Sequence, residues 1–183
     1  MQSLAPEVLE FWFGEGPERG KSHKRWFSKD PRFDADVRAR FASLHDRLST
    51  NRDWLGQPRD CLARIIVLDQ FPRNMFRGTA RAFATDALAL EAARLAVERG
   101  WDRGMLAVEQ LFVYLPFEHS EALADQDRAC ELMKDFDAEQ RVYAERHRDI
   151  IRRFGRFPHR NEILGRASTP EEIEFLKQPG SGF

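Results

Sequence analysis

The stretch RFGRFPHRNEILGR, residues 153–166, places three polar side chains directly after a Phe-Pro dipeptide. Proline disfavours a helical conformation at the residue before it and fixes its own φ, while the phenylalanine can anchor the joint in the core. The side chains that follow are then held rigidly; they are His159, Arg160 and Asn161. Arginine offers a bidentate donor fork and asparagine both donates and accepts, which suits a planar carboxylate or a phosphate.

A shorter echo of this pattern, DQFPRNMFRG, occupies residues 69–78. Here the Phe71-Pro72 joint is preceded by Asp69 and Gln70 and followed by Arg73 and Asn74. We expect the two joints to form halves of one polar pocket. In that pocket two arginines hold an anion and two asparagines orient it; they are Arg73 and Arg160, and Asn74 and Asn161.

Groups that could move protons accompany both joints. Asp69 lies four residues after Ile65 and eight after Cys61, so it continues a buried helical stripe and needs a partner there, because an unpaired buried charge costs several kcal/mol. Candidate partners are Arg73, Asn74, His147 and Arg160. In the helix predicted over residues 139–154, His147 shares an inward face with Tyr143, Ile150, Ile151 and Phe154.

A second acidic residue follows the apolar run LFVYLPF at residues 111–117, where Glu118 and His119 stand side by side. The acid–base chemistry that these residues allow is a general base, His147 or His159, working beside Asp69 or Glu118. The remaining members of the predicted ligand-binding set are Gln70, His119 and Arg156.

Three other uses of these residues are open. The two joints could cap neighbouring helices and connect them through a buried ion-pair network with Asp69 and Glu118, with no ligand. A metal site could use Glu118 and the three histidines, but the Glu-x-x-His spacing of helical metal sites is absent, so no metal or cofactor is expected. The stripe of Arg148, Arg152 and Arg156 favours a solvated helix face, and no nucleic-acid partner is expected.

Composition bounds the class of protein. The 183 residues are 32% charged and 42% hydrophobic with a net charge of −1, which fits one domain over residues 1–183 with a core of its own. Cys61 and Cys130 lack metal-type spacing and are expected to be small buried side chains in a reducing compartment. No stretch reaches the length of a membrane span, so we expect a cytoplasmic protein.

Helical periodicity and helical end signals recur along the chain, whereas alternating strand patterns do not. Asp30-Pro31 predicts the start of a helix ending near Asn51, whose buried stripe is Phe33, Val37, Phe41, Leu44 and Leu48. Pro58 opens the next helix, and Thr85-Asp86 caps a third that ends at Gly100. Trp12, Trp26, Trp54 and Trp101 are expected to anchor the core.

The second half of the chain shows the same signals. A helix through Met105, Val108 and Phe112 is expected to stop at Pro116, and Ser120 is expected to cap one that carries Leu123, Cys130, Leu132 and Met133. Gly155 ends the 139–154 helix, and a capping box from Thr169 to Glu172 opens the last. The prediction is an all-α fold of about seven or eight helices, arranged as antiparallel hairpins similar to tetratricopeptide arrays.

Several segments together resemble the DUF924 family of bacterial and fungal proteins. They are LEFWFG, RWF, IIVLDQFPRNMFRGTARAFATD, LFVYLPFEHSE, RHRDIIRRFGRFPHRNEILGR and STPEEIEFL. The resemblance covers about Val8 to Leu176 and implies an all-helical, tetratricopeptide-like fold, but it implies no activity. The motif residues of the family match here at Asp69, Gln70, Arg73, Asn74, Glu118, His119, Ser120, His147, Arg156, His159, Arg160 and Asn161.

The leading hypothesis is therefore a helical protein that binds a small anionic metabolite in an Arg/Asn/His/Asp pocket, with acid–base chemistry as an added capacity. The alternative is a tetratricopeptide-like module that holds a protein or peptide, in which the polar cluster is purely structural. No membrane partner is expected under either hypothesis.

Overall fold

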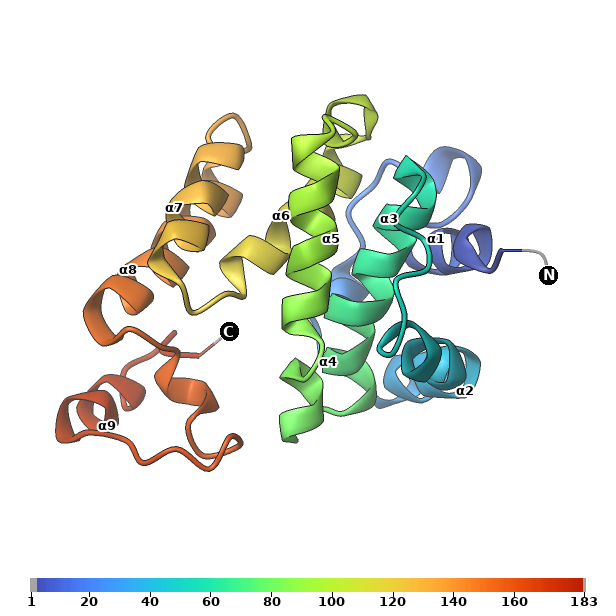
Figure 1. Cartoon of the computed structure of the whole chain (residues 1–183). Coiled ribbons are helices and arrows are strands. Elements are labelled where there is room, and N and C mark those ends of the chain that lie inside the picture. The colour runs from blue at the N-terminus through green and yellow to red at the C-terminus, as the bar shows by residue number, and fades with distance from the viewer. Residues whose placement is uncertain (1–2, 183) are drawn as a thin grey trace. The chain divides into compact units, whose positions relative to one another are not determined.

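The computed structural model describes residues 3–182, which form helices joined by turns and short loops (Figure 1). No strand occurs in these residues, and the predicted all-helical fold class is confirmed. The chain divides into two compact units. Unit 1 runs up to Arg77 and resumes from Arg81 to Pro116, and unit 2 contains Gly78–Ala80 and the chain from Phe117 onward. That residues 1–183 make one domain stays a prediction.

Unit 1 is built around an aromatic core. Its helices are α1 (Ala5–Phe13), α2 (Pro31–Leu48), α3 (Pro58–Ile65), α4 (Phe71–Met75), α5 (Asp86–Glu98) and most of α6 (Ala107–Glu118). Helix α3 packs against α1 and α5, and α2 packs against α4. Trp12 and Trp26 are buried in the core as expected, whereas Trp54 and Trp101 are only half-buried.

Helix α2 begins where its sequence signal predicts. The Asp30 carboxylate accepts hydrogen bonds from the backbone N–H groups of Arg32 and Phe33, at 2.9 and 3.3 Å. Pro31 occupies the first helical position, where a missing N–H costs nothing. All five residues of the predicted stripe are buried: Phe33, Val37, Phe41, Leu44 and Leu48.

Helix α5 starts and ends where its sequence signals predict, with Thr85 at the N-cap position, but the expected side-chain cap is absent. Gly100 has a φ of +66°, and the N–H groups of Gly100 and Trp101 donate to the carbonyls of Val97 and Ala96, which satisfies the last turn. Thr85 precedes the helix, but its side chain does not cap it. Its hydroxyl donates instead to the carbonyl of Leu68 at 2.6 Å.

Pro116 does not stop α6, which begins at Ala107, after Met105, and continues to Glu118. A proline this close to the end of a helix removes a single backbone hydrogen bond. The side chain of Gln126 supports the extra turn, because its Nε2 donates to the carbonyls of Phe117, Glu118 and Ser120 at 3.4, 2.6 and 2.6 Å.

Unit 2 contains α7 (Leu123–Leu132), α8 (Ala138–Phe154) and α9 (Pro170–Leu176), with α7 and α8 side by side (Figure 1). Ile150, Ile151 and Phe157 form a buried cluster against which Phe154 and Phe175 pack. The predicted capping box from Thr169 to Glu172 opens α9. These contacts tie the end of α8 to α9.

The prediction that Ser120 caps α7 is wrong. Ala122, not Ser120, is the residue before the helix, and the Ser120 hydroxyl donates to the Asp125 carboxylate at 2.7 Å. Leu123 is exposed rather than buried. The Ser120 hydroxyl satisfies the Ala122 N–H at 3.2 Å, so it orders the turn instead of the helix end.

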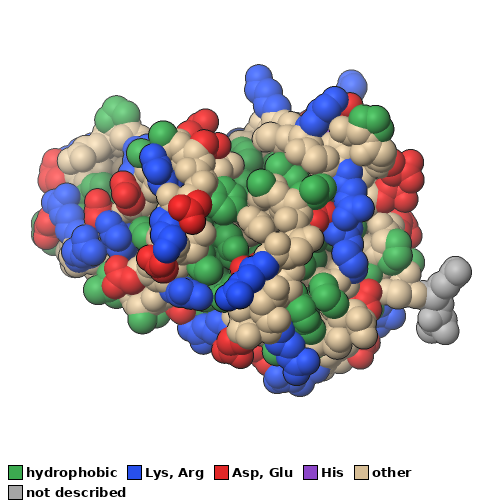
Figure 2. Space-filling view, turned by 90° about the horizontal axis from the view of Figure 1, so that it is seen from above, with side chains coloured by type: hydrophobic (Ala, Val, Ile, Leu, Met, Phe, Trp, Pro, Cys, Tyr) green, Lys and Arg blue, Asp and Glu red, His purple; other side chains and the backbone are tan. Residues whose placement is uncertain are grey.

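No helix among residues 3–182 combines the length and the apolar character that crossing a lipid bilayer requires. On the face shown in Figure 2, basic and acidic side chains are interspersed with hydrophobic ones. The mixed signs agree with the net charge of −1.

Candidate functional site

The second Phe-Pro joint has the structure that its sequence predicts. Helix α8 ends at Gly155, whose φ is +68° and whose N–H donates to the Ile151 carbonyl at 2.8 Å. Phe157 is extended and completely buried, and Pro158 starts a 3-10 turn, Pro158–Arg160. The joint therefore fixes where His159 and Arg160 leave the backbone.

His147 lies at the centre of the polar cluster in unit 2 and points inward as predicted. Its Nδ1 is 2.8 Å from the carbonyl of Tyr143 and 3.3 Å from a carboxylate oxygen of Glu118. Because a carbonyl only accepts hydrogen bonds, the neutral imidazole carries its hydrogen on Nδ1, which makes Nε2 the basic nitrogen. The Tyr143 side chain, predicted on the same inward face, is exposed instead.

Burial lowers the pKa of His147 to about 3, with the Tyr143 carbonyl acting in the opposite direction and the charges of His119, Arg160 and His159 adding to the decrease. Glu118 is only 2% exposed. The cluster thus holds a neutral imidazole next to a buried carboxyl group, within the electrostatic range of an arginine and two further histidines.

Contacts with His119 and Phe157 hold the Arg160 side chain in place. Its NH1 donates to the carbonyl of His119 at 3.1 Å, and its guanidinium lies 4.5 Å from the centre of the Phe157 ring. The Phe157 ring also contacts the rings of His147 and His159, at centroid distances of 5.7 and 5.6 Å. One buried phenylalanine therefore positions three cationic or ionisable side chains.

The segment after α9 folds back onto this cluster. The Ser181 hydroxyl donates to the Leu176 carbonyl at 3.1 Å, and a Cβ added at Gly182 would lie 3.6 Å from the Cβ of His159. The last described residues of the chain thus cover one side of His159.

Arg156 and Asn161 are engaged in a network with the start of α9. Arg156 donates to both carboxylate oxygens of Glu172, at 2.7 and 2.8 Å, and Asn161 Nδ2 donates to Ser168 and Glu172, at 3.0 and 3.3 Å. These bonds, Arg156 first, lower the pKa of Glu172 to about 2. The contacts connect neighbouring helices, as the structural alternative expects, but through Glu172 rather than Asp69 or Glu118. A ligand role for Arg156 and Asn161 stays a prediction.

Sequence reasoning did not identify Glu121 and Arg166, which support the Phe157 corner. The Arg166 guanidinium forms two hydrogen bonds with the Glu121 carboxylate, at 2.7 and 2.9 Å, and Glu121 also accepts from the Phe157 N–H at 2.8 Å. The two residues are 45 positions apart, and no local pattern relates them.

The first Phe-Pro joint differs from its prediction, because Pro72 does not interrupt the helix. Helices α3 and α4 are continuous through a π-turn, Ile66–Gln70, in which the Phe71 N–H donates to the Ile66 carbonyl. The wider turn accommodates the proline ring, which would clash with the preceding turn of an ordinary α-helix.

Asp69 is fully buried in this π-turn, as its place in the stripe predicts. Gln70 Nε2 donates to its carboxylate at 2.6 Å, and Arg73 NH1 lies 3.4 Å from the other carboxylate oxygen. Arg73, one of the predicted partners of Asp69, also forms a two-bond ion pair with Asp86 at 2.9 and 3.0 Å. The charges of Asp69 and Asp86 raise the pKa of Arg73 against the opposing effect of burial.

Asn74 connects α4 to α2. Its Nδ2 donates to the Asp34 carboxylate at 2.8 Å, and Arg77 donates to the same carboxylate. Residues 69–77 belong to unit 1 and residues 153–166 to unit 2. That the two joints line one pocket, with Gln70, Arg73 and Asn74 as ligand-binding residues, stays a prediction.

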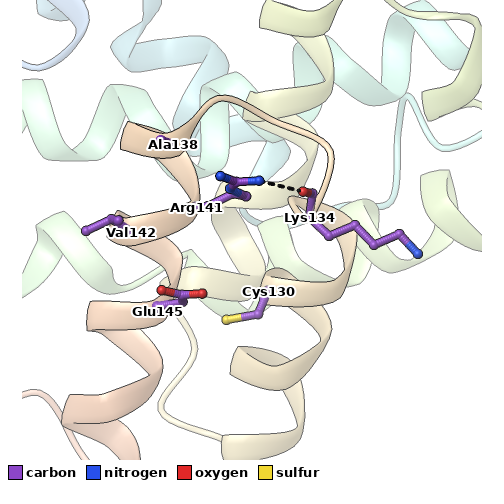
Figure 3. Close-up of a pocket in the computed structure, with 6 residues that line it drawn as sticks. All are labelled: Cys130, Lys134, Ala138, Arg141, Val142 and Glu145. Atoms are coloured by element: carbon purple, nitrogen blue, oxygen red, sulfur yellow. Dashed lines mark hydrogen bonds between the residues drawn. The ribbon is translucent and has the colours of Figure 1, made fainter.

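A cavity of about 300 Å³ opens between α7 and α8 (Figure 3). Cys130, predicted to be a buried hydrophobic residue, lines it and is half-buried, and Arg141 NH1 donates to the Lys134 carbonyl at 3.5 Å. Burial raises the pKa of the Cys130 thiol, which makes it a poor nucleophile at neutral pH. Cys61 is fully buried as predicted.

Among residues 3–182, no group of three or more His, Cys, Asp or Glu side chains is arranged to hold a metal ion. A family model described as "Bacterial protein of unknown function (DUF924)" matches residues 8–180. A solved structure of a protein of unknown function from Agrobacterium tumefaciens is similar, with 44% sequence identity and a TM-score of 0.84 over 95% of this chain and 97% of that one. No curated protein matches the chain.

Proposed function

Since the chain belongs to the DUF924 family, which carries no assigned activity, its function rests on the site, and we propose that unit 2 binds a small anionic metabolite. Arg160 and His159 hold the carboxylate or phosphate of the ligand, and His119 lies beside them. The supporting observation is the neutral His147 imidazole, buried against Glu118 and within the field of Arg160.

The proposal follows from the balance of charge in the cluster. Burial and neighbouring positive charges disfavour the protonated form of His147. An anion that binds to Arg160 offsets those positive charges, so it raises the pKa of His147 and favours uptake of a proton. Anion binding and protonation of His147 are therefore linked, and His147 can accept a proton from a bound substrate, with Glu118 beside the resulting imidazolium.

A thermal-shift screen with phosphorylated and carboxylated metabolites tests binding. A ligand of this site raises the melting temperature of the wild-type protein but not of Arg160→Ala, because the anion loses its charged donor. Arg160→Lys keeps the charge and serves where Arg160→Ala is poorly folded; it retains a reduced shift. Arg152→Ala is the matched control, since Arg152 lies on α8, is half-exposed and pairs with Asp149 and Asp127. A shift that survives in Arg160→Ala refutes the assignment.

The linkage to His147 has a test of its own. Titration calorimetry at about pH 5.5 in two buffers of different ionisation enthalpy gives the number of protons taken up with the ligand. We expect net uptake in the wild-type protein and less uptake in His147→Gln. Equal uptake in both proteins would assign the proton to another group and remove the acid–base role of His147.

A further inference from the structure

Unit 1 contains a cavity of about 390 Å³ outside the polar cluster of unit 2. Its walls come from the first turn of α3, from the loop before α6 and from the loop after α1. The residues that characterise it are Arg19, Arg59, Trp101, Met105, Leu106 and Glu109. Its volume lies within the range of small-molecule sites, roughly 300–1,000 Å³.

At the base of this cavity two arginines, Arg19 and Arg59, pair with one glutamate, Glu109. Glu109 is 1% exposed, and one of its carboxylate oxygens accepts from Arg19 Nε and NH2 at 3.1 and 2.9 Å and from Arg59 NH1 at 2.7 Å. The other oxygen accepts from the Leu106 N–H at 3.1 Å, which caps the start of α6. Burial raises the pKa of Glu109, but the bonds from Arg59, Arg19 and Leu106 outweigh it and lower the pKa overall.

Two guanidinium groups therefore share one carboxylate, which leaves a local excess of one positive charge. Glu109 is the only acidic side chain among the described residues that line the cavity. Both arginine side chains are 44% exposed. Since Arg59 uses only NH1 toward Glu109, its Nε and NH2 remain as donors. Like charges held on one oxygen repel each other, and an anion placed between the guanidinium groups and the solvent relieves that repulsion.

The remaining wall is apolar. Trp101 and Met105 are half-buried, and Leu106 is 44% exposed. Tryptophan and methionine side chains offer flat and adaptable contact surface to an apolar group. The exposed Leu106 adds apolar surface to this wall that a ligand can cover.

From this geometry we propose that the Arg19–Arg59 cavity binds a small amphiphilic anion, with its carboxylate or phosphate on the two guanidinium groups and a flat apolar group against Trp101. Glu109 holds the arginines in position and does not contact the ligand. This site does not depend on the function proposed for unit 2.

Ligand-observed and ¹⁵N NMR titrations with three probes test the site. Phenylacetate and phenyl phosphate carry the expected anion on an aromatic ring, and phenylacetamide is the uncharged match of the first. For such small anions we expect dissociation constants on the order of 1 mM, with a shift of the Trp101 indole N–H signal, identified with Trp101→Phe. Phenylacetamide should bind at least about tenfold more weakly, because it lacks the charge-assisted hydrogen bonds. Comparison of the two anions decides between carboxylate and phosphate ligands.

Arg59→Gln and Arg19→Gln should each weaken binding of the preferred anion at least about tenfold. Arg103→Gln is the control with the same charge change, because Arg103 lies in the loop before α6 but does not itself line the cavity. Arg160→Ala, the variant that tests unit 2, should leave this binding unchanged. Equal affinities in Arg59→Gln and Arg103→Gln, or an anion that binds no better than phenylacetamide, would overturn the proposal. Binding lost only in Arg160→Ala would assign the probe to unit 2 instead.

Discussion

The hydroxyl of Thr85 donates a hydrogen bond to the backbone carbonyl of Leu68 at 2.6 Å, although the two residues are 17 positions apart. Leu68 lies within the π-turn, and Pro72, four positions later, has no N–H to donate to the Leu68 carbonyl. The Thr85 hydroxyl supplies a donor that the proline cannot. His45 Nε2 lies 3.4 Å from the Thr85 hydroxyl, so the contact extends to α2.

Thr85→Val should destabilise the protein by about 1–3 kcal/mol, because it leaves the buried Leu68 carbonyl without a donor while keeping the size of the side chain. Thr85→Ser keeps the hydroxyl and should lose less. Urea unfolding measures both. Pro72→Ala restores a backbone N–H near that carbonyl, so the loss caused by Thr85→Val should be smaller in the Pro72→Ala background. Equal losses in the two backgrounds would contradict the pairing.

The acid stability of the protein should depend on His147. The pKa of this residue is about 6.5 unfolded and about 3 folded, so between these values the unfolded chain binds a proton that the folded protein does not. Stability therefore falls as the pH drops through this window, by up to about 1.4 kcal/mol per pH unit for one group. His147→Gln should flatten the dependence of unfolding free energy on pH, measured by urea unfolding from pH 7 to 4.5.

His45 contributes a second share of this acid sensitivity, since burial also lowers its pKa. The double variant His45→Gln/His147→Gln should show a smaller slope than either single variant. If the unfolding free energy of His147→Gln depends on pH as steeply as that of the wild-type protein, the inference that the buried imidazole is neutral is wrong.

Much of the fold could be predicted because its signals are local. Asp30 and Thr169 lie next to the N–H groups that they cap, and Gly155 has the left-handed φ that a helix end requires. Such contacts involve residues two to four positions apart, so the sequence shows both partners at once. The burial of Asp69 and His147 follows equally from helical spacing.

The failures of prediction have a common physical cause, which is tertiary contact that outweighs a local preference. Thr85 has the residue type of an N-cap, but a carbonyl from another helix takes its hydroxyl. Pro116 has the residue type of a terminator, but Gln126 donates to the carbonyls of the turn that follows. The Arg73–Asp86 and Arg166–Glu121 pairs connect residues whose proximity only the folded chain creates.

Gly155→Ala should destabilise unit 2 by about 1 kcal/mol. The added methyl group meets no atom within 4 Å, so the cost comes only from the φ of +68°, which L-residues disfavour. Asparagine tolerates this conformation better, and Gly155→Asn should lose less. Gly104→Ala is the control, because Gly104 also has open space but lacks a positive φ. Thermal or urea unfolding that ranks Gly104→Ala as the more damaging change would contradict this account.

The carboxyl group of Glu172 should titrate near pH 2 in a ¹³C NMR experiment, because Arg156 holds it ionised. Arg156→Gln removes the first cause of the decrease and should move the pKa toward the ordinary value of 4.5. Arg153→Gln removes an exposed arginine that pairs with Glu171 and should leave Glu172 unchanged. If the pKa of Glu172 stays low in Arg156→Gln, the backbone N–H of Thr169 and the Asn161 amide are enough to keep Glu172 ionised. Arg156 would then not be needed for that purpose and could bind a ligand.

A π-turn differs from an α-helical turn by one additional residue, so the helix on either side of Ile66–Gln70 keeps the phase of an uninterrupted α-helix. Deleting a single residue there, together with Pro72→Ala to remove the ring that an ordinary α-helical turn cannot accommodate, would let the backbone revert to α-helical pitch while α3 and α4 continue to present the same faces to their neighbours. The shortened chain would keep its hydrophobic register but would lose the extra position that the π-turn provides within Ile66–Gln70. With the proline replaced, the turn becomes a removable addition to a regular helix, and the shortened chain would show what the extra residue contributes.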